Sequence, residues 1–147
     1  MRSMKSVTFC GHAEVANPDA VRSWLMATVE RLIRQGASTF YLGGYGAFDR
    51  MAASVVCELK RSYPQIESVL VLPYLDREIN ANGYDATVYP PLETVPRRFA
   101  ISRRNEWMVD AADVVVAYVT HDWGGAAKTL EYARRKKHIF NYTEGTM

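Results

Sequence analysis

The fold of this chain is decided by the segment 114–137, which reads VVVAYVTHDWGGAAKTLEYARRKK. It begins with a strongly apolar run, 114–119, whose β-branched residues are typical of a buried central strand. A loop with a glycine pair follows, and apolar residues then return at helical spacing over 126–137. A strand, a glycine-containing loop and a helix in this order predict one unit of a parallel sheet that is covered by helices.

The same alternation recurs along the rest of the chain. Helix signals are clearest around 18–35, where Asn17 is the predicted N-cap, Pro18 takes the first helical position and Gly36 follows the end. We predict an α/β, Rossmann-like, doubly wound fold with a mainly parallel five-stranded sheet and helices on both faces. The further predicted strands are 6–10, 39–42, 68–72 and 139–142, and the further helices are 48–62 and 97–110.

The length of 147 residues is that of one domain, so residues 1–147 are expected to form a single nucleotide-binding domain. The segment 74–96 differs from the rest because it is polar, contains glycine and proline and has little periodicity. It is long for a connection within a small domain, and we therefore expect it to act as a lid.

Composition favours a cytoplasmic protein without a membrane span. The formal net charge is +2, which is too small to demand a polyanionic partner, so nucleic acid is a possible but not a favoured ligand. The chain has two cysteines, no CxxC pair and no apolar segment of membrane-spanning length.

Three loops are expected to converge at the carboxyl edge of the sheet, where open α/β sheets bind their ligands. They hold Gly11 and His12, then the run 43–46 (GGYG), then the run 120–125 (THDWGG). Glycine lets a ligand approach the backbone closely, and a helix that starts just beyond offers unpaired N–H groups to a phosphate. Neither Gly-Gly loop fits the Walker A motif, and we expect no cofactor.

Several motifs in these loops and in the helix 97–110 resemble a known family. They are GGYGAFD at 43–49, RNEWMVD at 104–110, ADV at 112–114, the glycine pair at 124–125 and EYA at 131–133. Together they resemble the YpsA-like branch of the SLOG superfamily, which includes the DNA-processing protein DprA and the LOG phosphoribohydrolases. The resemblance implies a Rossmann-like fold, a nucleotide or nucleotide-derived ligand and a homo-oligomer, most simply a dimer.

The chain also matches part of the motif of the LOG enzymes. Arg104 stands four residues before Met108, Gly124 and Gly125 match the glycine pair, and Glu131 matches the acid. Ala127 and Lys128 stand where the motif has Gly and Thr. The resemblance implies a phosphoribohydrolase that cleaves the N-glycosidic bond of nucleoside monophosphates, with Arg104 and Glu131 as catalytic residues. Glu131 has an equally good alternative role as an exposed residue paired with Arg134 or Arg135.

The other site residues also have two interpretations each. Asp49 is placed to accept ribose hydroxyl groups or to cap the helix that follows, and Asn105 to bind ligand or to satisfy a neighbouring group. Tyr45 and Trp123 are placed to stack on a base or to pack the rim of a pocket. His12 and His121 lack ligand-like spacing, so we do not predict a metal site.

We therefore expect a binding protein for a nucleotide-like, phosphate-bearing molecule, acting as a sensor. The alternatives are the phosphoribohydrolase and a DprA-like binder of single-stranded DNA. The latter would use Arg97, Arg98, Arg103, Arg104 and the basic segment after Arg134. The predicted ligand-binding residues are Gly11, His12, Gly43, Gly44, Tyr45, Gly46, Asp49, Arg104, Asn105, Thr120, Gly124 and Gly125.

Overall fold

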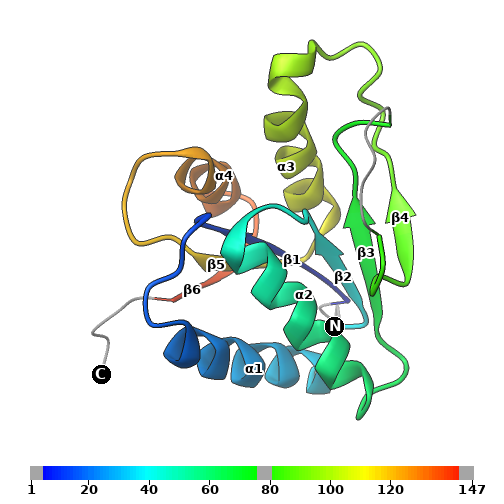
Figure 1. Ribbon diagram of the computed structural model, residues 1–147, viewed down its shortest axis with the longest axis vertical. Helices are drawn as coiled ribbons and strands as arrows, with labels where there is room; N and C mark the ends of the chain where they lie inside the picture. Colours follow the sequence, from blue (N-terminus) through cyan, green and yellow to red (C-terminus); the bar gives the residue numbers. More distant parts are fainter. Residues whose placement is uncertain (1–4, 76–80, 143–147) are drawn as a thin grey trace.

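The apolar runs of the sequence form one parallel sheet in the computed structural model, which describes residues 5–75 and 81–142. Within those residues the strand order is β4-β3-β2-β1-β5-β6, and every pairing is parallel (Figure 1). The strands are β1 (Ser6–Gly11), β2 (Thr39–Leu42), β3 (Glu67–Val71), β4 (Ala86–Val88), β5 (Val114–Tyr118) and β6 (His138–Asn141). The helices are α1 (Pro18–Arg34), α2 (Gly46–Lys60), α3 (Ala100–Ala111) and α4 (Gly125–Arg134), with a short 3-10 helix η1 (Arg97–Phe99) before α3.

The prediction of five strands was wrong, because the described residues contain six. The additional strand, β4, lies inside the segment 74–96 and, among the strands of residues 5–75 and 81–142, pairs only with β3, at the edge of the sheet. Asp85 fixes it there: its Oδ2 accepts a hydrogen bond of 2.9 Å from the Ser68 N–H, and its Oδ1 pairs with Lys60 Nζ at 2.6 Å. Part of the expected lid is therefore sheet. Residues 76–80 of that segment lie outside the described residues, and the lid remains a prediction.

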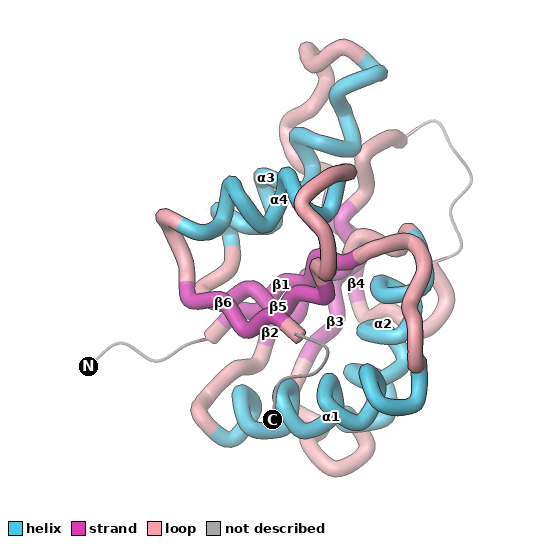
Figure 2. Tube along the Cα trace, turned by 90° about the vertical axis from the view of Figure 1, so that its left-hand side faces the viewer, coloured by secondary structure: helices cyan, strands magenta, loops and turns pink. Residues whose placement is uncertain are grey.

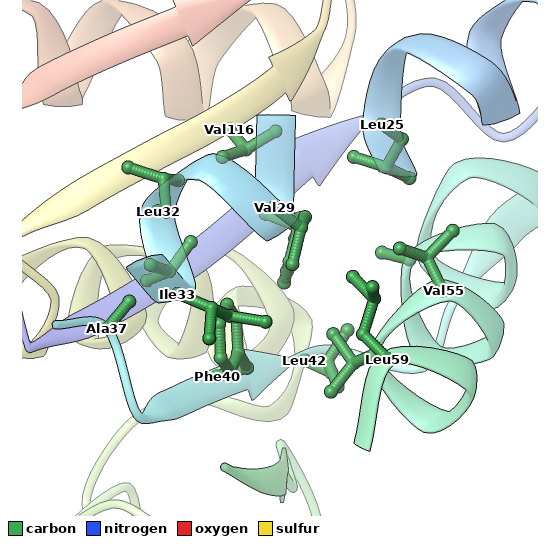
Figure 3. Close-up of a cluster of buried hydrophobic side chains, with 14 of the residues drawn as sticks. Leu25, Val29, Leu32, Ile33, Ala37, Phe40, Leu42, Val55, Leu59 and Val116 are labelled. Carbon is green, nitrogen blue, oxygen red and sulfur yellow. The ribbon is translucent and has the colours of Figure 1, made fainter. Parts of the chain in front are cut away.

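Helices cover both faces of the sheet, which confirms the doubly wound class. Figure 2 shows α1 and α2 on one face and α3 and α4 on the other. On the α1 and α2 side, Leu25 and Val29 of α1 meet Leu42 of β2 and Val55 and Leu59 of α2 in one buried cluster (Figure 3). Complete burial of each such side chain contributes roughly 1.5–3 kcal/mol. No helix among the described residues is long and apolar enough to cross a membrane.

The position of β1 and β5 in this sheet determines where a ligand can enter. The chain runs outward from β1 through β2 to β4, and then returns to place β5 on the other side of β1. This reversal of strand order is the switch point, where loops from neighbouring strands separate and leave a crevice. Gly11, the last residue of β1, is in register with Tyr118, the last residue of β5, so the two following loops start side by side.

Candidate functional site

A cavity of about 900 Å³ opens at this switch point. Ten of the twelve predicted ligand-binding residues line it, which shows that the three loops converge as expected. They are Gly11, His12, Tyr45, Gly46, Asp49, Arg104, Asn105, Thr120, Gly124 and Gly125. The space is large enough for a ligand of nucleotide size, since small-molecule sites usually measure about 300–1,000 Å³.

The start of α4 is the part of the cavity wall best suited to an anion. Gly124, the N-cap, has φ 94°, a conformation that favours glycine, and Gly124, Gly125 and Ala126 all line the cavity. Among residues 5–75 and 81–142, nothing accepts a hydrogen bond from the N–H groups of Gly125 and Ala126. Unpaired N–H groups at the positive end of a helix dipole attract phosphate and carboxylate groups.

The start of α2 differs, although its sequence is also rich in glycine. The Ala47 N–H donates to the Ala13 carbonyl oxygen at 2.8 Å, and the Phe48 N–H donates to the His12 carbonyl oxygen at 3.4 Å. Gly46 makes this contact possible, since it has φ 87° and a Cβ there would lie 2.8 Å from Ala13 Cα. The loop after β1 therefore occupies the first turn of α2, and the two glycine loops differ in their capacity to bind an anion.

Arg104 is almost completely buried and ties α3 to the ends of two strands. Only 1% of its surface is exposed, and its Nη1 donates to the carbonyl oxygens of Val71 at 2.7 Å and Gly43 at 2.9 Å. Its Nε donates to Asn105 Oδ1 at 2.9 Å, and no described residue accepts from Nη2. Burial lowers the pKa of the guanidinium, and the nearby Asp49 partly offsets that effect. Its positive charge thus lies under the floor of the cavity.

Asp49 lies in the first turn of α2, and its side chain caps the N-terminus of that helix. Its Oδ2 accepts a hydrogen bond of 3.2 Å from the N–H of Tyr45, the N-cap of that helix, which supports the capping role among the two that the sequence left open. An ideal Cβ on Gly43 would lie 3.0 Å from Asp49 Oδ2 and 3.2 Å from Arg104 Nη2, so only glycine fits between the two charged groups without displacing them. Burial raises the pKa of Asp49 to about 6, although Arg104 and the Tyr45 N–H act in the opposite direction.

Three aromatic rings stack along the rim of the cavity. His12 lies on His121 with 3.8 Å between ring centroids, and His121 lies on Trp123 with 3.5 Å between centroids. His12 Nε2 accepts a hydrogen bond of 2.9 Å from the Thr120 N–H, so this nitrogen carries no proton. Burial lowers the pKa of His12, as does His121. Among the described residues, no group of three or more His, Cys, Asp and Glu side chains is arranged to hold a metal ion.

Cys10 also reaches the cavity wall, and its environment keeps the thiol protonated. Burial, with a smaller contribution from Asp49, raises its pKa to about 12. The thiolate is the nucleophilic form of cysteine, so Cys10 contributes a small buried side chain rather than a reactive group.

Three predicted residues do not line the cavity. Gly43 lies beneath it, between Asp49 and Arg104, and a Cβ on Gly44 would meet Leu70 at 2.9 Å. Glu131 lies on α4 beside a separate hollow of about 500 Å³, with 73% of its side chain exposed and its Oε2 3.4 Å from Arg134 Nε. Arg104 and Glu131, the two residues of the hydrolase alternative, are therefore not brought into one site.

Sequence reasoning missed several residues of the cavity wall. Residues 13–16 follow β1 without a glycine or charge pattern, and Ile101, Met108 and Thr129 look like ordinary helix residues. The only signal for the first group was its place after a central strand. Ile101 and Met108 were detectable from their spacing relative to Arg104, because positions three or four apart share one face of a helix, whereas Thr129 lies on α4 and had no such signal.

Comparisons with known proteins show what this chain resembles in sequence and in fold. No family model matches this chain. The uncharacterized SPbeta prophage-derived protein YoqJ of Bacillus subtilis (strain 168) is 24% identical over 136 residues, which cover 76% of this chain and 78% of that protein.

Two solved structures have a similar fold. DNA processing protein A of Helicobacter pylori, whose structure concerns its single-stranded DNA binding mode, has a TM-score of 0.65 at 16% identity and covers 95% of this chain. This chain spans only 65% of the length of that structure. The molybdenum cofactor carrier protein of Chlamydomonas reinhardtii has a TM-score of 0.63 at 16% identity, covering 96% of this chain and 78% of the other. This chain therefore shares the Rossmann-like α/β fold of these two proteins.

Proposed function

We propose that this protein binds a nucleotide or nucleotide-derived molecule, with its phosphate at the start of α4. The observation that carries the proposal is the open first turn of α4, whose Gly125 and Ala126 N–H groups have no acceptor among the described residues and line a cavity of about 900 Å³. The first N–H groups of a helix have no acceptor within the helix, and a phosphate oxygen at this place satisfies two of these donors at once.

The charges around the cavity support an anionic ligand. Arg104 lines the cavity from its buried position, and Asp49, whose pKa is raised to about 6, compensates its charge less at mildly acidic pH than at neutral pH. In a site shielded from water such a charge acts more strongly than it does at the surface. The Asn105 side chain lines the same cavity and is oriented by the hydrogen bond from Arg104 Nε. The wall thus offers donors and positive charge to a phosphate ester.

A pair of matched variants tests the phosphate site. Ala126 and Ala127 both lie in the first turn of α4, but Ala126 lines the cavity and Ala127 lines the separate hollow. Aspartate is favourable at the start of a helix, so Ala126→Asp and Ala127→Asp both retain the fold. Isothermal titration with AMP, ribose 5-phosphate and ADP-ribose should show binding that Ala126→Asp weakens about tenfold or more and Ala127→Asp leaves much less changed. No binding of any of the three ligands to the folded protein would refute the proposal.

Single-stranded nucleic acid is the second candidate, because one structural neighbour is described by its single-stranded DNA binding. An exposed arginine and aromatic pair supports it: Arg98 Cζ lies 4.7 Å from the centroid of Phe99, which is 47% exposed. Arg104 cannot belong to the predicted basic surface, because it is buried. Binding of a fluorescent oligothymidylate should fall steeply with salt and weaken in Arg98→Ala. Absence of salt-dependent binding removes this candidate.

A further inference from the structure

The stack of His12, His121 and Trp123 forms a flat platform whose last ring is open. His121 covers one face of the Trp123 indole, with 3.5 Å between ring centroids and 17° between the planes. Trp123 is nevertheless 67% exposed, and it lines the cavity. A large, exposed aromatic ring held parallel to its neighbour is the arrangement that receives another planar ring by stacking.

Contacts at the other end of the stack fix its orientation. The Thr120 N–H holds His12 through a hydrogen bond of 2.9 Å to Nε2, and the Tyr118 ring meets His12 edge-on with 5.7 Å between centroids. Tyr118 is itself buried, at the end of β5. The three rings are therefore held in place by contacts that begin at β5. Because the Trp123 side chain is already ordered, ligand binding costs less conformational entropy.

The platform also lies close to the proposed phosphate site along the chain. Trp123 precedes Gly125 by two residues and Ala126 by three, so its Cα lies within about 11 Å of both. In a nucleoside monophosphate, a single pentose joins the planar ring to the phosphate. A ring on Trp123 and a phosphate on the α4 N–H groups can therefore belong to one small molecule.

We propose that the exposed face of Trp123 is a stacking site for a planar heteroaromatic ring, so that the ligand is a nucleoside monophosphate or a molecule built like one. This inference rests on the proposed function, because it takes the start of α4 as the phosphate site. It adds the ring-binding part of the cavity and predicts that a sugar phosphate without a base binds more weakly.

Two probes and one fluorescent reporter test the stacking site. The sequence contains three tryptophans, and neither Trp24 nor Trp107 lines the cavity, so Trp24→Phe with Trp107→Phe leaves Trp123 as the only reporter. AMP should quench its fluorescence, whereas ribose 5-phosphate should bind without quenching. In titration calorimetry AMP should bind about 5- to 150-fold more tightly than ribose 5-phosphate. Trp123→Leu should remove this difference, and Trp123→Phe should keep part of it.

The outcomes separate this inference from the proposed function. If both probes bind with equal affinity, or if Trp123→Leu binds AMP as the wild type does, the stacking site is overturned while the phosphate site stands. If neither probe binds while ADP-ribose does, the stacking site is overturned and the proposed function stands; if none of the three ligands binds, both proposals are overturned. A fall of AMP affinity in Trp123→Leu to that of ribose 5-phosphate, with ribose 5-phosphate binding retained, supports the stacking site, and it excludes misfolding as the cause because the phosphate site still functions.

Discussion

Arg104 Nη1 lies 2.7 Å from the carbonyl oxygen of Val71, so a charged side chain of α3 closes the carboxyl end of β3. The same nitrogen also donates to the Gly43 carbonyl oxygen, at the end of β2. Buried carbonyl groups need a hydrogen-bond donor, and Arg104 supplies one to both of these. The residue therefore holds two loops of the site in place.

Loss of Arg104 should destabilise the fold. Arg104→Leu leaves two buried carbonyl oxygens without their donor, and we expect the free energy of unfolding to fall by about 2–5 kcal/mol. Arg103→Leu is the matched control, because Arg103 is exposed and should change stability by at most about 0.5 kcal/mol. Urea denaturation followed by circular dichroism measures both. Equal effects of the two substitutions would contradict the structural role of Arg104.

The contrast between these two arginines shows what the sequence can and cannot predict. The apolar run at 114–119 and the caps around 18–35 predict elements that the structure places at Val114–Tyr118 and Pro18–Arg34, because burial and capping leave local patterns. Arg103 and Arg104 have the same local chemistry. Only the packing of α3 against the sheet decides which of the two is buried.

Other parts of the site were unpredictable for similar reasons. The strand β4 has three residues and one neighbour, so it carries neither the length nor the alternation that reveals a strand. The two Gly-Gly loops look alike in sequence, but the carbonyl groups of His12 and Ala13 fill the first turn of α2, whereas the first turn of α4 stays open. Such long-range backbone contacts leave no local pattern.

Asp49 should make stability depend on pH in an unusual direction. Burial raises its pKa from 3.8 to about 6, so the folded state binds this proton more tightly than the unfolded state does. The contribution of Asp49 to stability is therefore present below about pH 4 and is lost as the pH rises to about 6. Asp49→Asn keeps an acceptor for the Tyr45 N–H and does not ionise. The free energy of unfolding of this variant should rise relative to the wild type between about pH 4 and 7, and a constant difference would contradict the prediction.

His12 should have the opposite effect. Its pKa is lowered from 6.5, first by burial and then by His121, so the unfolded state takes up this proton more readily. The stability contribution of neutral His12 is present above about pH 6.5 and is lost as the pH falls below that value. His12→Gln retains an oxygen acceptor for the Thr120 N–H and should lose less stability than the wild type between about pH 7 and 5. Parallel unfolding curves for the two proteins at every pH would refute the assignment.

Glu131 should be dispensable for ligand binding. It lies outside the cavity and pairs with Arg134 over 3.4 Å on an exposed face of α4. Glu131→Gln should therefore cost at most about 0.5 kcal/mol of stability and leave AMP affinity within about twofold of the wild type. A test for release of free base from AMP with wild type and Glu131→Gln completes the experiment. Base release that disappears in the variant would revive the hydrolase alternative.

Substitutions in the glycine pair at the start of α4 should affect protein stability and ligand binding differently. A Cβ at either position meets no atom within 4 Å, but Gly124 has φ 94° whereas Gly125 begins the helix. Gly124→Ala forces alanine into a left-handed conformation and should destabilise the protein by about 1–2 kcal/mol.

Gly125→Ala should leave stability unchanged or raise it by up to about 1 kcal/mol, because alanine is the better helix former. Gly125 nevertheless lines the cavity at the proposed phosphate site, so the added methyl group should lower the affinity for ribose 5-phosphate. Calorimetry of a Gly125→Ala protein that is at least as stable as the wild type therefore isolates the phosphate site, and an unchanged affinity would place the phosphate elsewhere.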